Sequence, residues 1–263
     1  MKRIILLLSV VFLCFTSCKK EDKNADLYYS DTLLSQITSG DQAIHGLTYN
    51  SSYLIYESME PFVYSKYTYD SGNILRKEET AFSFSPLSCV YIPGASLESD
   101  PRNAKVSGYS EYEYDNSLKL IKKSTYSINN GTDQLTYYHT FEYKNGNIAR
   151  VSIFNAQGQM TQYNDYSYDD NGNMTKDEMY LVGATVKLYE TRIYEFDNKN
   201  NPYKVFSSEG IPGKYTNRNN IIKETLISYN GTVENRNTTL HTYAYNNLDY
   251  PVKIDQLDCK YGK

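Results

Sequence analysis

The 263-residue chain has no tryptophan, only four cysteines, and no basic patch or run of lysine and arginine. Without such a patch, nucleic acid is not an expected partner. The chain also lacks a Gly-x-Ser-x-Gly elbow, a His-Glu-x-x-His pair and a phosphate-binding glycine loop. These absences favour a protein that is not an enzyme and that uses no metal or cofactor.

Helical periodicity is also missing after residue 26, because the apolar side chains recur at a spacing of two rather than three and four. Only seven prolines occur, and Pro86, Pro93 and Pro101 fall close together. Proline cannot occupy a central strand. We therefore expect a loop insert at about 82–106 in an otherwise all-β chain.

Tyrosine is abundant instead, with 29 residues, and much of it recurs in a short unit. The clearest copy is Tyr166–Met174, in which Tyr166 and Tyr168 stand two apart and Asn171-Gly172 follows. Residues two apart share a face of an extended chain, so both tyrosines point the same way. Asn and Gly tolerate the positive φ of tight turns. The unit therefore predicts a β-hairpin.

Eight copies align on the second aromatic of each unit, and the weakest copy is Gly213–Tyr229. Another hairpin is expected around Asn155–Gly158. Together they predict a soluble antiparallel meander of about 14–16 strands, strongly curled or closed like a barrel. Charges on both strand faces argue against lipid-facing strands. The aligned aromatics are Tyr49, Tyr69, Tyr114, Tyr143, Tyr168, Phe196, Tyr215 and Tyr245.

The N-terminus has the form of a secretory signal, with a basic start and an apolar run that is too short to span a bilayer. Its end resembles a bacterial lipobox, which implies cleavage after residue 17 and lipidation of Cys18; an ordinary signal peptide with an incidental cysteine is the alternative. Removing residues 1–17 lowers the formal net charge from −4 to about −6. Residues 18–26 are expected to form a flexible tether, and residues 27–263 a single β domain.

Three residues of the tether, Lys20, Glu21 and Asp22, resemble the export signal of Bacteroidetes surface lipoproteins. That resemblance implies attachment to the outer membrane by the lipid anchor, facing the cell exterior. A solvated charged tether is the alternative. After loss of Cys14 and lipidation of Cys18, two thiols remain. Cys89 and Cys259 either pair in the oxidising exterior or stay isolated.

The repeated hairpins resemble the YD (Rhs-type) repeat, and Tyr168-Asp169-Asp-Asn-Gly172-Asn-Met174 matches it directly. About residues 45–258 resemble a Bacteroidetes lipoprotein family of unknown function with YD-like hairpins. The resemblance implies a porin-like all-β fold and supplies no information on activity. Rhs shells enclose a toxin, but this chain is too short for that role.

Candidate site residues are few. One candidate is an exposed tyrosine face that binds a glycan or a protein; the alternative is that the tyrosines are structural cross-strand ladders. His45, His139 and His241 precede their anchors by four residues, but they belong to separated units. The acidic turn at Asp169–Asn173 lacks the spacing of a calcium hand. The candidate face consists of Tyr67, Tyr69, Tyr112, Tyr114, Tyr166, Tyr168, Tyr243 and Tyr245.

Three functions agree with this pattern. The first is a non-catalytic surface lipoprotein that binds a ligand, plausibly a glycan, and it predicts a contiguous patch of exposed tyrosines. The second is a structural envelope protein without a small ligand. The third is a hydrolase, which requires two or three polar side chains to converge in one pocket.

Overall fold

The computed structural model describes residues 32–60, 62–82, 101–231 and 233–262. Within these ranges the chain forms one antiparallel sheet of 17 strands and two 3-10 segments, which confirms the predicted all-β meander. The strands are β1 (Leu34–Ser39), β2 (Gln42–Tyr49), β3 (Ile55–Met59), β4 (Val63–Tyr69), β5 (Leu75–Phe82), β6 (Val106–Tyr114), β7 (Leu120–Asn129), β8 (Thr132–Lys144), β9 (Asn147–Asn155), β10 (Met160–Tyr168), β11 (Met174–Val182), β12 (Val186–Phe196), β13 (Ile221–Asn230), β14 (Val233–Leu240), β15 (Tyr243–Tyr245), β16 (Pro251–Ile254) and β17 (Leu257–Tyr261). The 3-10 segments are η1 (Pro101–Asn103) and η2 (Pro202–Glu209).

The strands follow one another in a single row. Among the described residues, sixteen pairings have a defined register; they run from β15 through β16 and β17 to β1, and then in chain order to β14. The chain passes from β14 to β15 through His241 and Thr242. None of these pairings joins β14 to β15, so the prediction of a strongly curled or barrel-like sheet is not supported.

Six of the hairpin turns have the same construction. At the first position an Asp or Asn accepts hydrogen bonds from the backbone N–H groups two and four residues later, and a residue with positive φ stands at the fourth position. At Asp169, for example, Oδ1 accepts from Asn171 N at 2.9 Å and from Asn173 N at 2.8 Å, and Gly172 has φ 83°. Turn chemistry therefore accounts for this acidic cluster. The six turns begin at Asn50, Asp70, Asp115, Asn155, Asp169 and Asn246.

The turn between β12 and β13 is opened by residues 198–219, which we call the insert. Asp197 Oδ1 still accepts from Lys199 N at 2.9 Å, but its second donor is Asn220 N at 3.0 Å. Asn220 therefore takes the place that the fifth residue has in the other turns. The predicted hairpin copy at Gly213–Tyr229 is wrong, because its first half belongs to the insert and only β13 is a strand.

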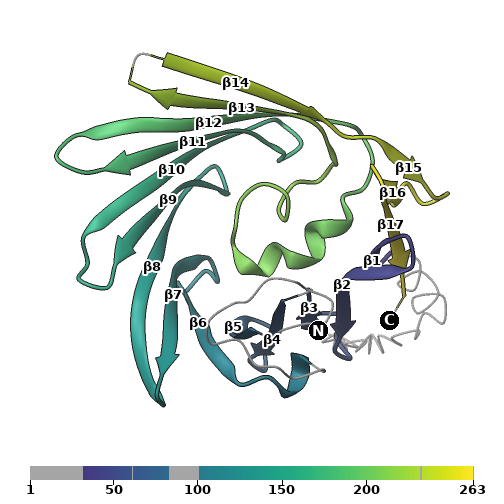
Figure 1. Ribbon diagram of the computed structural model, residues 1–263, viewed down its shortest axis with the longest axis horizontal. Helices are drawn as coiled ribbons and strands as arrows, with labels where there is room; N and C mark the ends of the chain where they lie inside the picture. Colours follow the sequence, from purple (N-terminus) through teal and green to yellow (C-terminus); the bar gives the residue numbers. More distant parts are fainter. Residues whose placement is uncertain (1–31, 61, 83–100, 232, 263) are drawn as a thin grey trace, which may run out of the picture.

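The insert lies against one face of the sheet, which we call the inner face, and Figure 1 shows the strands arranged around it. It carries η2, although no helical pattern was predicted. η2 begins after Asn201, whose side chain accepts from Tyr203 N at 3.0 Å. It ends at Gly210, which has φ 70°. A Cβ at Gly210 would lie 2.2 Å from Leu120 Cδ2, so the close approach of the insert to β7 requires glycine here.

Polar contacts fix the insert to the turns on both sides. Toward β11, Asn219 N donates to Asn173 Oδ1 at 2.9 Å, and Met174 N donates to Asn217 Oδ1 at 2.7 Å. These asparagines are buried, so the bonds satisfy groups that water does not reach. The C-terminal part of the insert is thereby held at the end of the β10–β11 hairpin.

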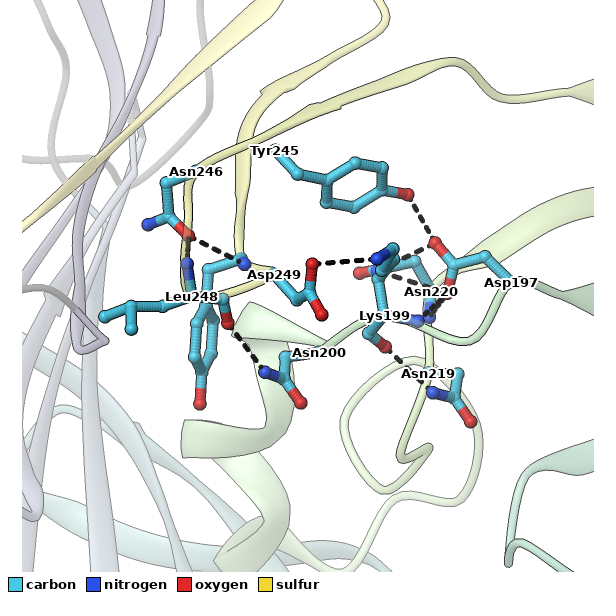
Figure 2. A network of polar contacts seen from close by, with 10 residues as sticks. Asp197, Lys199, Asn200, Asn219, Asn220, Tyr245, Asn246, Leu248 and Asp249 are labelled. Atoms are coloured by element: carbon cyan, nitrogen blue, oxygen red, sulfur yellow. Dashed lines mark hydrogen bonds and ion pairs between the residues drawn. The ribbon is translucent and has the colours of Figure 1, made fainter.

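Figure 2 shows the contacts on the other side, toward the turn between β15 and β16. Lys199 Nζ lies 2.8 Å from Asp249 Oδ1, and Asn200 Nδ2 donates to Leu248 O at 3.0 Å. The Tyr245 hydroxyl donates to Asp197. The insert therefore bridges two turns that are distant in the strand row, the β15–β16 turn at one end of the row and the β10–β11 turn within it.

The hydrophobic core lies between the inner face and the insert. Phe206 of η2 is only 3% exposed and packs among apolar side chains from the strands. Side chains two apart on each strand share this face, which explains why the paired aromatics of the repeat enter the core. The buried cluster comprises Leu34, Ile37, Leu47, Ile55, Tyr67, Leu75, Tyr112, Leu120, Phe141, Val151, Phe206, Ile254 and Cys259.

Two further points concern the connection between β5 and β6 and the absence of a membrane-spanning helix among the described residues. β5 ends at Phe82 and β6 begins at Val106, so the loop insert expected at about 82–106 corresponds to their connection, of which residues 83–100 lie outside the described part. No helix among the described residues is long and apolar enough to cross a membrane.

Candidate functional site

The eight tyrosines of the predicted ligand face do not form an exposed patch. Tyr67 and Tyr112 are 4% and 3% exposed, and the other six are half-buried on the inner face. Several hydroxyls are bonded within the sheet: Tyr69 donates to Ile55 O at 2.9 Å and Tyr168 to Ile148 O at 2.8 Å. The prediction of an exposed tyrosine face is therefore wrong, since the pleat that aligns these rings turns them toward the core.

The remaining sequence-based sites fall into two groups. The signal peptide, the tether, Cys18 and the motif Lys20, Glu21 and Asp22 lie outside the described residues, as does Cys89. Cys259 is a buried free thiol on β17, and burial raises its pKa to about 11. The lipid anchor stays a prediction from sequence.

The three histidines lie in different surroundings. His45 stacks on Phe206 with ring centroids 5.5 Å apart, and burial lowers its pKa. Burial lowers the pKa of His139 to about 4, so this imidazole is neutral at pH 7. His241 Nδ1 lies 2.8 Å from Asp255 Oδ2. Within the described part of the chain, no group of three or more His, Cys, Asp or Glu is placed to hold a metal ion.

A cavity of about 690 Å³ lies between the insert and the inner face at β10–β13 and β15–β17. Ligand sites in proteins are usually concave pockets of this order that combine apolar walls with a few polar groups. Its aromatic and apolar walls include Met174, Met179, Tyr194, Tyr203, Ile221, Tyr243, Ile254 and Leu257. Its charged or titratable side chains are Asp177, Glu190, Arg192, Lys214, Glu224, His241 and Asp255.

Arg192 connects two acidic residues of the cavity. Its Nε donates to Glu190 Oε1 at 2.6 Å, and its Nη1 donates to Glu224 Oε1 at 3.0 Å. The alternation along β12 places Glu190, Arg192 and Tyr194 on the same, inner face. Each glutamate uses only one carboxylate oxygen in these bonds, so the other can accept from a ligand hydroxyl.

Asp177 lies beside this ion-pair group, because it pairs with Arg192 across the β11–β12 ladder. Its Oδ1 accepts from the amide of Asn164 at 2.7 Å. Burial raises the pKa of Asp177 above its ordinary value, and the Asn164 amide opposes that shift. Among the described residues, no cation lies within ion-pair distance of this carboxylate.

The insert supplies the opposite wall. Lys214 Nζ lies 3.7 Å from the ring centroid of Tyr203, a cation–π contact within the insert itself. Asn201 donates through Nδ2 to Lys214 O at 2.7 Å and to Asn217 O at 2.9 Å, which fixes the backbone that borders the cavity. The cavity is thus framed by a segment that is held in place by its own hydrogen bonds.

A second polar cluster lies at the other end of η2, around a cavity of about 170 Å³. Tyr67 donates to Glu209 Oε1 at 2.9 Å, and Tyr112 donates to Glu78 Oε2 at 3.0 Å. Lys123 Nζ lies 3.4 Å from Glu78 Oε2. Burial, together with the charge of Glu78, raises the pKa of Glu209 to about 7. The small volume and the enclosed position indicate a polar support for the insert.

Sequence reasoning did not single out the residues of the larger cavity. One signal was present: Glu190, Arg192 and Tyr194 recur at a spacing of two, so charged residues share the face of the repeat aromatic. Charges on a core-facing position indicate a polar cavity, because an ionised group is rarely buried in an apolar core. The contribution of the insert could not be found this way, since its position depends on contacts with distant turns.

Comparisons with known proteins add information on the fold. No family model matches the chain, and no curated protein matches it, so the resemblance to a YD-repeat family is not confirmed. A porin-like protein from Bacteroides vulgatus ATCC 8482 aligns with a TM-score of 0.52 and 11% identity, covering 88% of this chain and 99% of that one. At this identity the likeness shows a common fold and nothing more.

Two further solved structures are less similar. A porin-like protein from Bacteroides uniformis ATCC 8492 aligns with a TM-score of 0.38 and 13% identity, covering 85% of this chain and 89% of that one. A protein with unknown function from Bacteroides fragilis NCTC 9343 aligns with a TM-score of 0.37 and 12% identity, covering 50% of this chain and 89% of its own.

Proposed function

We propose that this protein is a non-catalytic binding module that takes a polyhydroxylated ligand, a glycan or a fragment of one, into the cavity beside the insert. The module is carried on the outer membrane by a lipid on Cys18 and faces the cell exterior. Its ligand site is the cavity lined by Glu190, Arg192 and Glu224, in place of the tyrosine face expected from the sequence.

The observation that supports this proposal is the mixture of groups around one cavity of about 690 Å³. Carboxylate oxygens of Glu190 and Glu224 accept hydrogen bonds from hydroxyl groups, and the Arg192 guanidinium donates them. Rings of Tyr194 and Tyr243 offer flat apolar surface beside these groups. A sugar presents both kinds of surface, with hydroxyls at its rim and C–H groups on its faces.

The membrane address rests on the N-terminal sequence, in which a short apolar run precedes Cys18 and then Lys20, Glu21 and Asp22. The negative net charge fits a partner other than nucleic acid. The resemblance to porin-like Bacteroides proteins is compatible with an envelope protein. The YD-like hairpins serve as scaffold in this proposal, since their aromatics pack in the core.

The test is binding of the purified protein to a glycan array, compared with two variants. Glu224→Gln removes one charge from the cavity and weakens the hydrogen bond from Arg192, which then has a neutral acceptor. Glu195→Gln is the matched control, because Glu195 pairs with Lys223 at 2.7 Å but lies exposed on β12. We expect specific glycan binding that Glu224→Gln weakens at least about tenfold, a loss typical of one charge-assisted hydrogen bond, and that Glu195→Gln leaves unchanged.

Other outcomes identify the alternatives. A folded protein that binds no glycan on the array contradicts the proposal and favours a structural envelope protein. Release of shorter sugars from the bound glycan supports a hydrolase, for which Asp177, Glu190 and Glu224 are three of the four carboxylates that line the cavity. Binding that both variants retain places the ligand outside the cavity.

A further inference from the structure

The charges around the cavity are unbalanced. Four carboxylates line it, from Asp177, Glu190, Glu224 and Asp255, against the cations of Arg192 and Lys214 and the imidazole of His241. Arg192 is shared by Glu190 and Glu224, and His241 is bonded to Asp255. One carboxylate, that of Asp177, therefore has no cationic partner of its own.

Asp177 is well placed to receive a cation from a ligand. Its register partner Arg192 directs both of its hydrogen bonds to the glutamates. Among the described residues, the one side-chain hydrogen bond of Asp177 comes from the neutral Asn164 amide, at 2.7 Å to Oδ1. Oδ2 is left with no bond among the described residues. Half-buried in a cavity, this oxygen gains strongly from a charged donor, because a charge-assisted bond is about twice as strong as a neutral one.

Aromatic rings stand next to this carboxylate. Tyr166 pairs with Asp177 across the β10–β11 ladder, so their side chains emerge on the same face. Burial and then the charge of Asp177 raise the pKa of Tyr166. Tyr194 lines the same cavity as Asp177. An ammonium group is attracted by the face of such rings as well as by the carboxylate.

The other charged groups near Asp177 do not prevent it from binding a ligand cation. Across from it on β12 are Glu190 and Arg192, which neutralise each other in part; beside it on β11 is Glu178, which bonds to Lys176 at 2.9 Å. Asn164 on β10 is neutral. Lys214 of the insert lies over Tyr203 and forms no bond with Asp177. Arg192 stabilises the Asp177 carboxylate from across the ladder, Glu190 and Glu178 oppose that effect, and none of these side chains bonds to the free oxygen.

We propose that the ligand of this cavity carries a primary ammonium group beside its sugar hydroxyls, as an amino sugar does, and that Asp177 binds the ammonium. This inference rests on the proposed function, since it names the class of sugar that the same cavity takes. Asp177 makes the site selective for an amino sugar over a neutral one. The Glu190–Arg192–Glu224 group binds the hydroxyls that both sugars share.

The test is isothermal titration of the purified protein with glucosamine, glucose and N-acetylglucosamine at pH 6, where the amine is protonated. We expect glucosamine to bind at least about tenfold more tightly than the other two. Asp177→Asn keeps the shape and the acceptor for Asn164 but removes the charge, and we expect it to reduce the affinity for glucosamine to that for glucose. Asp170→Asn, in an exposed turn, changes the net charge equally and is expected to change nothing.

The possible failures differ from one another. Equal binding of glucosamine and glucose overturns the role of the ammonium and leaves the proposed function standing. A preference for glucosamine that survives in Asp177→Asn overturns the assignment to Asp177. No binding of any of the three sugars overturns this inference, and the proposed function then depends on the glycan array alone. Circular dichroism of each variant shows whether the fold is retained.

Discussion

At the scale of the residue, the tyrosine hydroxyl explains why the repeat uses tyrosine where phenylalanine would fill the same space. Tyr69, Tyr143 and Tyr168 each donate to the carbonyl at the start of the return strand of an earlier hairpin. These bonds are partly buried, and a buried acceptor without a donor is costly. The tyrosine ring packs on the inner face, and its hydroxyl donates a hydrogen bond to the backbone carbonyl.

Replacing Tyr168 with phenylalanine tests this role. Tyr168→Phe removes the 2.8 Å bond to Ile148 O and should lower the free energy of unfolding by about 1–3 kcal/mol, the cost of an unsatisfied buried carbonyl. Tyr189→Phe is the control, because Tyr189 is exposed on β12. Urea unfolding of both variants measures the difference. Equal stabilities would contradict a stabilising role of the Tyr168 hydroxyl.

Glu209 gives a pH dependence with a definite sign. Its pKa is about 7 in the folded protein and close to 4.5 in the unfolded chain. Between these values the folded state holds the proton that the unfolded state releases, so the contribution of Glu209 is present below about pH 4.5 and is lost as pH rises through about 7. Each pKa unit corresponds to about 1.4 kcal/mol.

The variant Glu209→Gln keeps an acceptor for Tyr67 and cannot ionise. Relative to the unmodified protein, its free energy of unfolding should therefore rise with pH between 5 and 8, by up to about 3 kcal/mol. Glu111→Gln, at an exposed position on β6, is the control for net charge. The opposite effect of His139 is common to all of these proteins. A constant difference between Glu209→Gln and the unmodified protein over this range would show that Glu209 titrates normally.

At the scale of the element, the five-residue turn decides where hairpins form. An Asp or Asn at its first position and a residue with positive φ at its fourth are enough to define it, and tyrosine, leucine and aspartate also occur at the fourth position in this protein. Non-glycine residues are strained in that conformation. Glycine at Gly158 and Gly172 avoids the strain.

Gly172→Ala should lower the free energy of unfolding by about 1 kcal/mol, because it forces a Cβ into φ 83°. Nothing lies within 4 Å of the added Cβ, so the effect would be conformational and not steric. The matched variant is Gly46→Ala, where the added Cβ also has open space and φ is not positive. Thermal unfolding that affects both equally would refute the turn argument.

The insert has its own test. Phe206→Ala removes the aromatic ring at the centre of the core and should cost about 3–5 kcal/mol. Phe82→Ala, at an exposed ring on β5, should cost far less. The comparison is made by urea denaturation. If the two substitutions have similar costs, the insert does not form part of the core.

How much was predictable differs between these elements. The pattern of two aromatics, an acid or amide and a turn predicted hairpins such as β10–β11, because every signal is local. The insert was misread because Tyr215, followed by Asn219-Asn220 and Ile221-Ile222, resembles a repeat that lacks only its first aromatic. Its true position depends on Asn220, which is distant from Asp197 in sequence but bonds to it in place of the fifth residue of a hairpin turn. The local periodicity of the sequence does not predict such a long-range contact.

At the scale of the whole molecule, the sheet and the insert together create the cavity. The sheet alone offers an inner face of aromatics and charges, and the insert covers part of it while leaving the region near Arg192 open. Because the insert covers part of the inner face, the candidate site is this open region and not the predicted tyrosine face. Residues on the inner face belong to the core where the insert packs over them. Only the uncovered part of that face can bind a ligand.

The most direct test of this account is nuclear magnetic resonance of ¹⁵N-labelled protein titrated with glucosamine. The central claim is that ligand binds between the insert and β11–β13. It predicts chemical-shift changes at the amides of Gly213, Asn219 and Ile221, which border the cavity, and none along the exposed strand β14. Changes confined to β14 or to the outer turns, or no change at saturating sugar, would contradict the claim.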